Sequence, residues 1–179
     1  MANKTPDVAV QKDAALGGRF ARFAPWVSLV ARLVLGGALM YAGLIKLPNL
    51  KRSVGAVRAY ELPLPDWAIE FIGYALPIGE VLLGAVIVAG VFTRWSALLG
   101  VLLMVVFIIG IASAWIRGLN IDCGCFTEGG VLADDVKTKY LEDILRDIGF
   151  IACGVFAMIF PKSPISIDKW IAGNDQEET

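Results

Sequence analysis

Histidine is absent from the 179 residues of this chain, and charged residues make up only 18% of it. Because histidine is the usual general base, metal ligand and pH-sensitive group, proton transfer here would depend on carboxylates, tyrosine, thiols or water. The net charge is −1 and no basic cluster exceeds a few residues, which argues against a nucleic-acid partner. Cysteine is scarce, with three residues, and no internal repeat or low-complexity tract is present.

Hydrophobic residues are abundant instead. They make up 57% of the chain, with a mean hydropathy of +0.68, whereas soluble domains are about 45–50% apolar. A helix that spans a membrane needs about 20 mainly apolar residues, and four segments supply them. The predicted spans are residues 25–46, 67–91, 94–116 and 140–160. The sequence therefore predicts an all-α membrane protein, a four-transmembrane-helix bundle in one domain over residues 25–160.

The fourth predicted span is the least apolar, because its first turns contain four charged residues, Glu142, Asp143, Arg146 and Asp147. An alternative is that residues 134–147 form an amphipathic helix at the membrane surface, which leaves about thirteen purely apolar residues, too few to cross. We favour a span, with the charges facing the bundle and Leu141, Ile144 and Leu145 facing lipid.

Aromatic residues mark the ends of the predicted spans. Trp26, Trp67, Trp95 and Trp115 all fall there, and Tyr140 opens the fourth segment. Rings with one polar edge favour the headgroup level of a bilayer, so this placement supports the predicted boundaries.

The two ends of the chain are polar and are expected to be tails, residues 1–24 and 161–179. The charged stretch of the first is too long for a signal peptide. Four spans would place both tails on one side of the membrane and the cysteine-containing loop on the other. Lysine and arginine are evenly divided between the two faces, so the positive-inside rule does not choose the orientation.

Each of the first three predicted spans carries a stripe of residues spaced by three and four, which lie on one helix face. Glycine and serine in such stripes let helix backbones approach closely. The stripes consist of Arg32, Gly36, Leu39, Gly43 and Lys46, then Glu70, Gly73, Pro77, Glu80 and Gly84, then Ser96, Gly100, Leu103, Phe107 and Gly110. We expect them to face one another in a compact bundle.

Arg32 and Glu80 lie near the middle of their predicted spans. A charge at that depth costs at least about 2.5–3.5 kcal/mol, so it should pair or meet water. One interpretation is a polar cavity that binds a headgroup such as a quinone ring or relays protons. The other is a buried ion pair between the two residues that fixes the register of the helices.

The loop over residues 118–130, GLNIDCGCFTEGG, is the candidate site of chemistry, with Asp122 beside Cys123 and Cys125. Four interpretations are open. The two thiols could close a strained, oxidising disulfide; bind a metal; form disulfides with a partner protein; or be ordinary small residues. Zinc and iron–sulfur sites need about four ligands, which disfavours a metal site, and Cys153, deep in the fourth segment, is expected to be a small hydrophobic residue.

The sequence resembles a known family in RLVLGGALMYAGLIKL, in the Tyr-Glu-Leu-Pro loop after it, and in LPIGEVLLGAVIVAGVFTRWSALLG. These stretches are similar to DoxX-like membrane proteins, and IRGLNIDCGCF resembles the MauE (methylamine utilisation) branch. The resemblance covers about residues 30–160 and implies a four-span protein of the bacterial inner membrane, similar in layout to the vitamin K epoxide reductase bundle. Thr127 stands where MauE-like proteins more usually have glycine, and a Cys-x-Cys loop replaces the Cys-x-x-Cys helix of the reductases, so quinone chemistry does not transfer residue by residue.

The resemblance also implies a function in disulfide formation or maturation of exported proteins beside a thioredoxin-like partner. We therefore predict a membrane thiol–disulfide oxidoreductase that uses Cys123 and Cys125. Asp122 is its candidate base, Arg117 would favour the thiolate, and Arg32 and Glu80 are candidate contacts for a quinone that accepts the electrons. No covalently bound cofactor is expected. The alternative is a non-catalytic accessory subunit of a larger membrane complex, such as a respiratory one. The cysteine loop is expected outside the cytoplasm, because disulfides persist in oxidising compartments, and both termini inside it.

Overall fold

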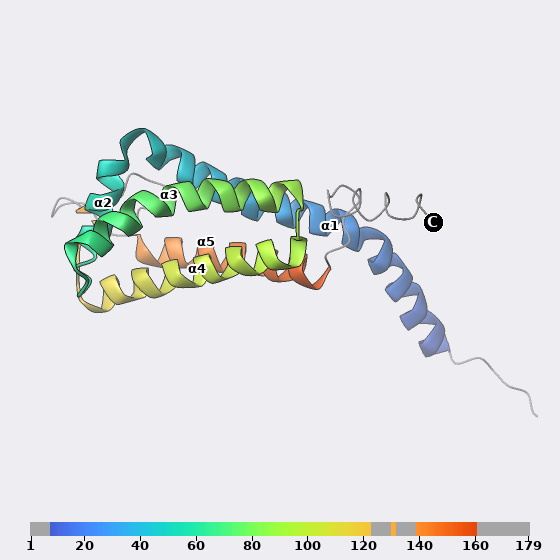
Figure 1. The fold of residues 1–179 in the computed structure, drawn as a ribbon. Coiled ribbons are helices and arrows are strands. Elements are labelled where there is room, and N and C mark those ends of the chain that lie inside the picture. Colours follow the sequence, from blue (N-terminus) through green and yellow to red (C-terminus); the bar gives the residue numbers. More distant parts are fainter. Residues whose placement is uncertain (1–7, 123–129, 132–138, 161–179) are drawn as a thin grey trace, which may run out of the picture.

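A computed structural model describes residues 8–122, 130–131 and 139–160 of the chain. Its elements are four long helices, a short helix and a small two-stranded sheet (Figure 1). The long helices are α1 (Val8–Lys46), α3 (Asp66–Ala89), α4 (Thr93–Ile116) and α5 (Tyr140–Ile159). A 3₁₀ turn (Leu47–Asn49) leads from α1 into the short helix α2 (Leu50–Ala59), and strands β1 (Ile121–Asp122) and β2 (Gly130–Val131) follow α4.

The long helices form a packed bundle, which confirms the predicted fold class. Helix α1 lies mainly against α3 and α5, and α4 lies mainly against α5. Helices α3 and α4 are joined by a tight turn at Gly90, whose φ of 71° is readily adopted only by glycine. One difference from the sequence-based expectation is the start of α1, which begins at Val8 and continues through Pro25. Residues 8–22 are rich in alanine and other good helix formers, which favours this extension.

Glycine residues bring α1 and α3 into close contact. A Cβ atom added at Gly36 would lie 2.8 Å from the carbonyl oxygen of Gly84, and one at Gly43 would lie 2.6 Å from that of Pro77. Only glycine fits at such distances, so the two backbones are in direct contact, as the small-residue stripe predicts. All five residues of the α1 stripe are buried. The prediction was wrong for Glu70, which is exposed near the start of α3, where its carboxylate avoids the cost of burial.

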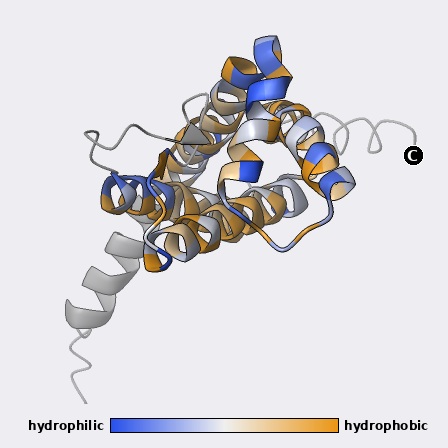
Figure 2. Cartoon of the chain, turned by 90° about the vertical axis from the view of Figure 1, so that its left-hand side faces the viewer, coloured by the Kyte–Doolittle hydropathy of each residue, from blue (hydrophilic) through white to orange (hydrophobic). Residues whose placement is uncertain are grey.

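The surface and length of the helices identify a multi-pass membrane protein. Three helices, α1, α3 and α4, are long and apolar enough to cross a bilayer. Figure 2 shows hydrophobic residues along the long helices, with hydrophilic ones gathered at the end that carries α2. Large apolar side chains such as Val30, Leu82 and Ile109 are more than half exposed. A continuous apolar surface of this kind is rare on soluble monomers, and lipid is its natural solvent.

Tryptophan residues lie at two levels of the bundle. Trp95 opens α4 and Trp115 lies near its end, and both are more than half exposed. Twenty residues separate them, which corresponds to about 30 Å along a helix, the thickness of the hydrocarbon core. Trp67, at the start of α3, shares the level of Trp115 because α3 and α4 are antiparallel. This arrangement matches an aromatic residue at each interface.

Helix α5 differs from the other three. Its charged first turns keep it outside the set of helices that qualify as spans by length and composition, and its crossing of the membrane stays a prediction. It packs along both α4 and α1. Gly154 fits against Val101 of α4 and Leu35 of α1, where an added Cβ would lie within 3.0 Å of either side chain. These contacts make α5 part of the bundle.

Candidate functional site

The segment that contains Cys123 and Cys125 connects two paired strands. β1 and β2 are antiparallel, with Ile121 opposite Val131 and Asp122 opposite Gly130. Residues 123–129, and with them both cysteines, lie outside the described residues, so neither thiol is placed. Asp122 is partly buried at the end of β1. The sequence predicts a turn-rich loop here, and the structure adds a short hairpin at its base.

Tyr140 holds the base of this hairpin. Its hydroxyl accepts a hydrogen bond from the backbone N–H of Ile121 at 3.2 Å and donates one to the carbonyl oxygen of Leu119. The side chain is 5% exposed and packs with Ile111, Ala114 and Ile121. The expectation that Tyr140 lies at the lipid interface was therefore wrong, because its ring and hydroxyl both have partners inside the protein.

Replacing Tyr140 with phenylalanine should loosen the hairpin while leaving the bundle folded. The ring is kept, but two buried backbone groups lose their partner, which costs about 1–3 kcal/mol. We expect faster amide hydrogen exchange at Ile121 and Asp122, with unchanged exchange in α3. Equal protection of β1 in the variant and the wild type would show that the hydroxyl does not hold the hairpin.

Arg117 connects the hairpin end of α4 to the turn after α2. Its guanidinium donates to the carbonyl oxygens of Tyr60 and Glu61, and its Nε donates to that of Ser113 at 3.2 Å. These bonds give the cation a structural task. That Arg117 favours a thiolate stays a prediction, since both thiols lie outside the described residues.

Glu80 is buried in an ion pair, but its partner is Lys46 and not Arg32. The Nζ atom of Lys46 lies 2.9 Å from both carboxylate oxygens of Glu80. Lys46 is 6% exposed and Glu80 is fully buried. The sequence pointed to Glu80 correctly, and Lys46 was in the predicted α1 stripe, but the pairing with Arg32 was wrong.

Arg32 lies at the other end of α3. Its Nη2 donates to the carbonyl oxygen of Val88 at 2.9 Å, and its guanidinium covers Gly90, where α3 ends. Val88 follows Glu80 by eight residues, or about 12 Å along the helix. The end of a helix carries partial negative charge on its free carbonyl groups, so Arg32 stabilises the end of α3. It is too far along the bundle to share a site with Glu80.

A cavity of about 150 Å³ lies beside the Lys46–Glu80 pair, between α2, α3 and α4. Its walls include Lys46 of α1, Ser53 and Tyr60 at α2, Pro77 of α3, and Phe107 and Gly110 of α4. The Nζ of Lys46 lies 5.8 Å from the centre of the Phe107 ring. Tyr60 also packs against the cluster that contains Ile121 of β1, and β2 contacts α2. The cavity is therefore at the hairpin end of the bundle.

Ser53 is the unusual polar group of this cavity. It is 6% exposed, and its hydroxyl has no hydrogen-bond partner among the described residues. The sequence offers one weak signal for it, because the spacing of three and four places Ser53 on the helix face of Leu50, Val54 and Val57. Neither Arg32 nor Glu80, the predicted cofactor contacts, lines the cavity.

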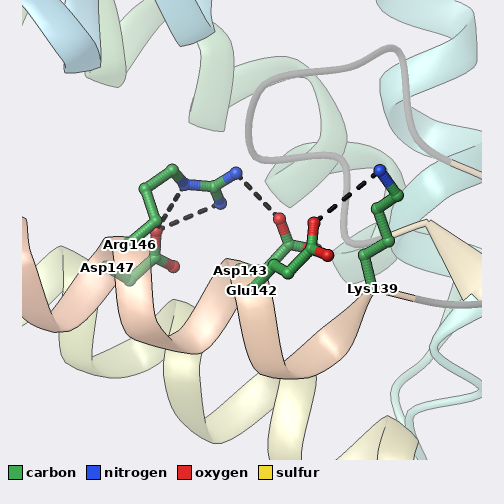
Figure 3. A network of polar contacts seen from close by, with 5 residues as sticks. All are labelled: Lys139, Glu142, Asp143, Arg146 and Asp147. Carbon is green, nitrogen blue, oxygen red and sulfur yellow. Dashed lines mark hydrogen bonds and ion pairs between the residues drawn. The ribbon is translucent and has the colours of Figure 1, made fainter.

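A second charged cluster lies on α5 (Figure 3). Arg146 bonds Asp143 at 2.8 Å and Asp147 at 3.1 Å, and Lys139 lies 3.7 Å from Glu142. Asp147 is fully buried, whereas Glu142 is exposed, so only some of these charges face the bundle as predicted. Tyr140, which opens α5, lies next to Trp115 of α4, and Gly154 of α5 lies next to Val101 of α4. Asp147 is midway between Tyr140 and Gly154. It is thus near the level of Phe107 and of the Lys46–Glu80 pair.

Cys153 is the third cysteine of the chain. Cys153 is half-buried, has no disulfide partner among the described residues and packs against the apolar cluster of Leu35, Leu39, Ile87 and Met104. It follows Tyr140, at the base of the hairpin, by thirteen residues, or about 20 Å of helix. This placement fits a small hydrophobic residue. No group of metal-ligating side chains occurs within residues 23–122 and 139–160.

Comparison with known proteins gives a family. The sequence model for "Methylamine utilisation protein MauE" matches residues 24–160. The methylamine utilization protein MauE of Paracoccus denitrificans is 31% identical over 106 residues, which are 59% of this chain and 56% of the relative. The match thus spans just over half of the relative's length. No solved structure matches the chain.

Proposed function

The chain belongs to the MauE family, and from this membership and the site we propose that it is a membrane thiol–disulfide redox protein that serves methylamine utilisation. Its task in this proposal is disulfide formation or maturation of exported proteins. Cys123 and Cys125 carry the reaction. The observation that supports the proposal most directly is the anchored hairpin, since both cysteines belong to the seven residues that join its strands.

The anchoring matters because thiol–disulfide exchange needs an accessible, positioned pair. Asp122 comes directly before Cys123 in the chain, and Gly130 comes shortly after Cys125. The two residues are paired across the strands. Tyr140 ties β1 to α5, and Arg117 ties the end of α4 to the α2–α3 turn. The strand that leads into the segment is thus attached to the bundle from two directions.

The proposed reaction is a two-electron exchange. A thiolate of the substrate protein attacks the Cys123–Cys125 disulfide and forms a mixed disulfide, and a second substrate thiolate resolves it. The substrate leaves with a disulfide, and Cys123 and Cys125 become thiols. Reoxidation passes two electrons and two protons to a membrane quinone, which becomes a quinol. Asp122, next to Cys123 in the chain, is the candidate acceptor for a thiol proton.

The partner is a thioredoxin-like or exported protein that contains cysteines, and the hairpin end of the bundle faces out of the cytoplasm. Disulfides are stable in such compartments, whereas cysteine thiols are kept reduced in the cytosol. In this orientation both termini are cytoplasmic. The protein resides in the cytoplasmic membrane of a bacterium and contacts lipid through the apolar faces of α1, α3 and α4.

Thiol labelling in intact cells tests the proposal. A membrane-impermeant maleimide should label Cys123 and Cys125 only after mild reduction, because the resting pair is an external disulfide. Replacing both with serine should reduce the rate of substrate-disulfide formation to background, whereas Cys153→Ser, the matched control, should leave it unchanged. Mass spectrometry of the labelled residues and the redox state of exported proteins provide the readouts.

Other outcomes would select a different function. Labelling without reduction would place the thiols outside but contradict an oxidised resting pair. Full function of the double serine variant would support the alternative, a non-catalytic accessory subunit of a larger membrane complex.

A further inference from the structure

The cavity at the hairpin end presents hydrogen-bond donors that the described protein does not use. The hydroxyl of Ser53 has no partner there although the residue is 6% exposed. An ammonium group has three N–H donors, and Glu80 accepts two of those of Lys46. The third N–H has no oxygen acceptor among the described residues. The cavity is therefore lined by two residues, Ser53 and Lys46, that can donate a hydrogen bond to an acceptor on a bound molecule.

The other walls and the size of the cavity define the rest of its occupant. Pro77, Phe107 and Gly110 give an apolar lining. An apolar cavity of about 150 Å³ holds one benzene-sized ring, and this cavity has that volume, so it fits the ring of a larger molecule whose substituents extend beyond the cavity. Val106 also lines it and is 60% exposed on α4, so a ligand dissolved in the hydrocarbon can reach the cavity from the side.

We infer that this cavity binds a lipid-soluble ring that carries a carbonyl oxygen. The oxygen accepts hydrogen bonds from Ser53 and Lys46, and the ring lies against Phe107 and Pro77. Glu80 keeps the ammonium of Lys46 at the wall and neutralises its charge, so a neutral carbonyl is a better match than an anion. Quinones have this chemistry; their use as electron acceptors here rests on the proposed function, but their binding does not.

The ligand contacts in this site differ from Arg32 and Glu80, which the sequence suggested as quinone contacts. Arg32 is at the opposite end of α3, and both oxygens of Glu80 are occupied by Lys46. The direct contacts of the ligand are thus Ser53 and Lys46, with Glu80 as a positioning residue. Tyr60 connects the cavity wall to the cluster that contains Ile121, which puts the ligand at the same end of the protein as strand β1.

A pair of probes of nearly the same shape tests this site. Duroquinone is a fully substituted ring with two carbonyl oxygens, and durene has the same ring and methyl groups without them. We would titrate each into the purified full-length protein in dodecyl maltoside and follow thermal unfolding by circular dichroism, since a ligand of the folded state raises the melting temperature. Duroquinone should raise it saturably, and durene should do so less.

Ser53→Ala should weaken duroquinone binding about fivefold, the effect of one hydrogen bond. The variant should fold normally, because it removes a group without a partner among the described residues. Ser96→Ala is the matched control: Ser96 is also buried but bonds backbone carbonyl oxygens at the opposite end of α4. Gly110→Leu should fill the cavity and abolish binding, since an added Cβ meets only Tyr60, at 3.5 Å.

Three results would overturn the inference: no saturable effect of duroquinone, an equal effect of durene, or unchanged affinity in Ser53→Ala. An equal effect of durene would mean that the cavity takes any apolar group, such as an acyl chain. Replacing Cys123 and Cys125 with serine should leave duroquinone binding intact, so the failure of this site and the failure of the thiol function are distinguishable.

Discussion

Replacing Lys46 with methionine is expected to destabilise the protein by about 3–5 kcal/mol, because it leaves the carboxylate of Glu80 buried without its cation. Glu80 is fully buried, and Lys46 supplies both of its 2.9 Å contacts. Glu80→Leu should cost a similar amount by leaving the ammonium unpaired. Unfolding in a titration with sodium dodecyl sulfate, followed by tryptophan fluorescence, measures these differences.

The double variant Lys46→Met/Glu80→Leu is the control. Replacing a whole buried ion pair by apolar residues is often neutral or stabilising, so it should recover most of the lost stability. A double variant as unstable as the single ones would show that the pair has a further structural partner. Duroquinone binding should stay weak in the double variant, because the Lys46 donor is gone although the fold has recovered.

The second large effect is expected at Gly36. Gly36→Leu should separate α1 from α3 and destabilise the protein by about 3 kcal/mol, the upper part of the range for overpacking. Its first side-chain atom would lie 2.8 Å from the backbone oxygen of Gly84 and 2.8 Å from a methyl group of Val88. A backbone oxygen inside a helix cannot turn away, so the whole helix must move.

Gly37 provides a matched control in the next position. No atom lies within 4 Å of a Cβ added there, and the residue is exposed. Gly37→Leu should leave the stability unchanged or raise it by up to about 1 kcal/mol, because leucine is the better helix former. The same detergent titration compares the two variants. Equal stability of both would mean that the α1–α3 contact is looser than the structure has it.

These two contacts show how far the sequence leads. The glycine stripe of α1 is visible as a spacing of three and four, and its burial follows because helices in lipid approach each other through small residues. The long apolar runs likewise predict the bundle, since length and hydropathy are properties of each segment alone. The stripe also contained Lys46, but spacing alone gave no reason to pair it with Glu80.

The partner of Glu80 depends on how two helices are shifted along each other. Arg32 and Lys46 both lie on the inner face of α1, and both are cations that a carboxylate could bind. Packing at Gly36–Gly84 sets the register, which brings Arg32 to the end of α3 and leaves Glu80 within reach of Lys46. A register shift of about two turns would bring Arg32 to Glu80 in place of Lys46, and hydropathy does not encode the register.

The sequence by itself determined that this is a four-helix membrane protein of the MauE kind with a candidate thiol pair between its third and fourth long helices. These properties follow from local composition, period and motif. Only the tertiary structure decided the Lys46–Glu80 pair, the role of Tyr140 under the hairpin, and the cavity with the Ser53 hydroxyl. Each of these requires side chains from separate helices to meet, and the backbone contacts between helices determine which of them do.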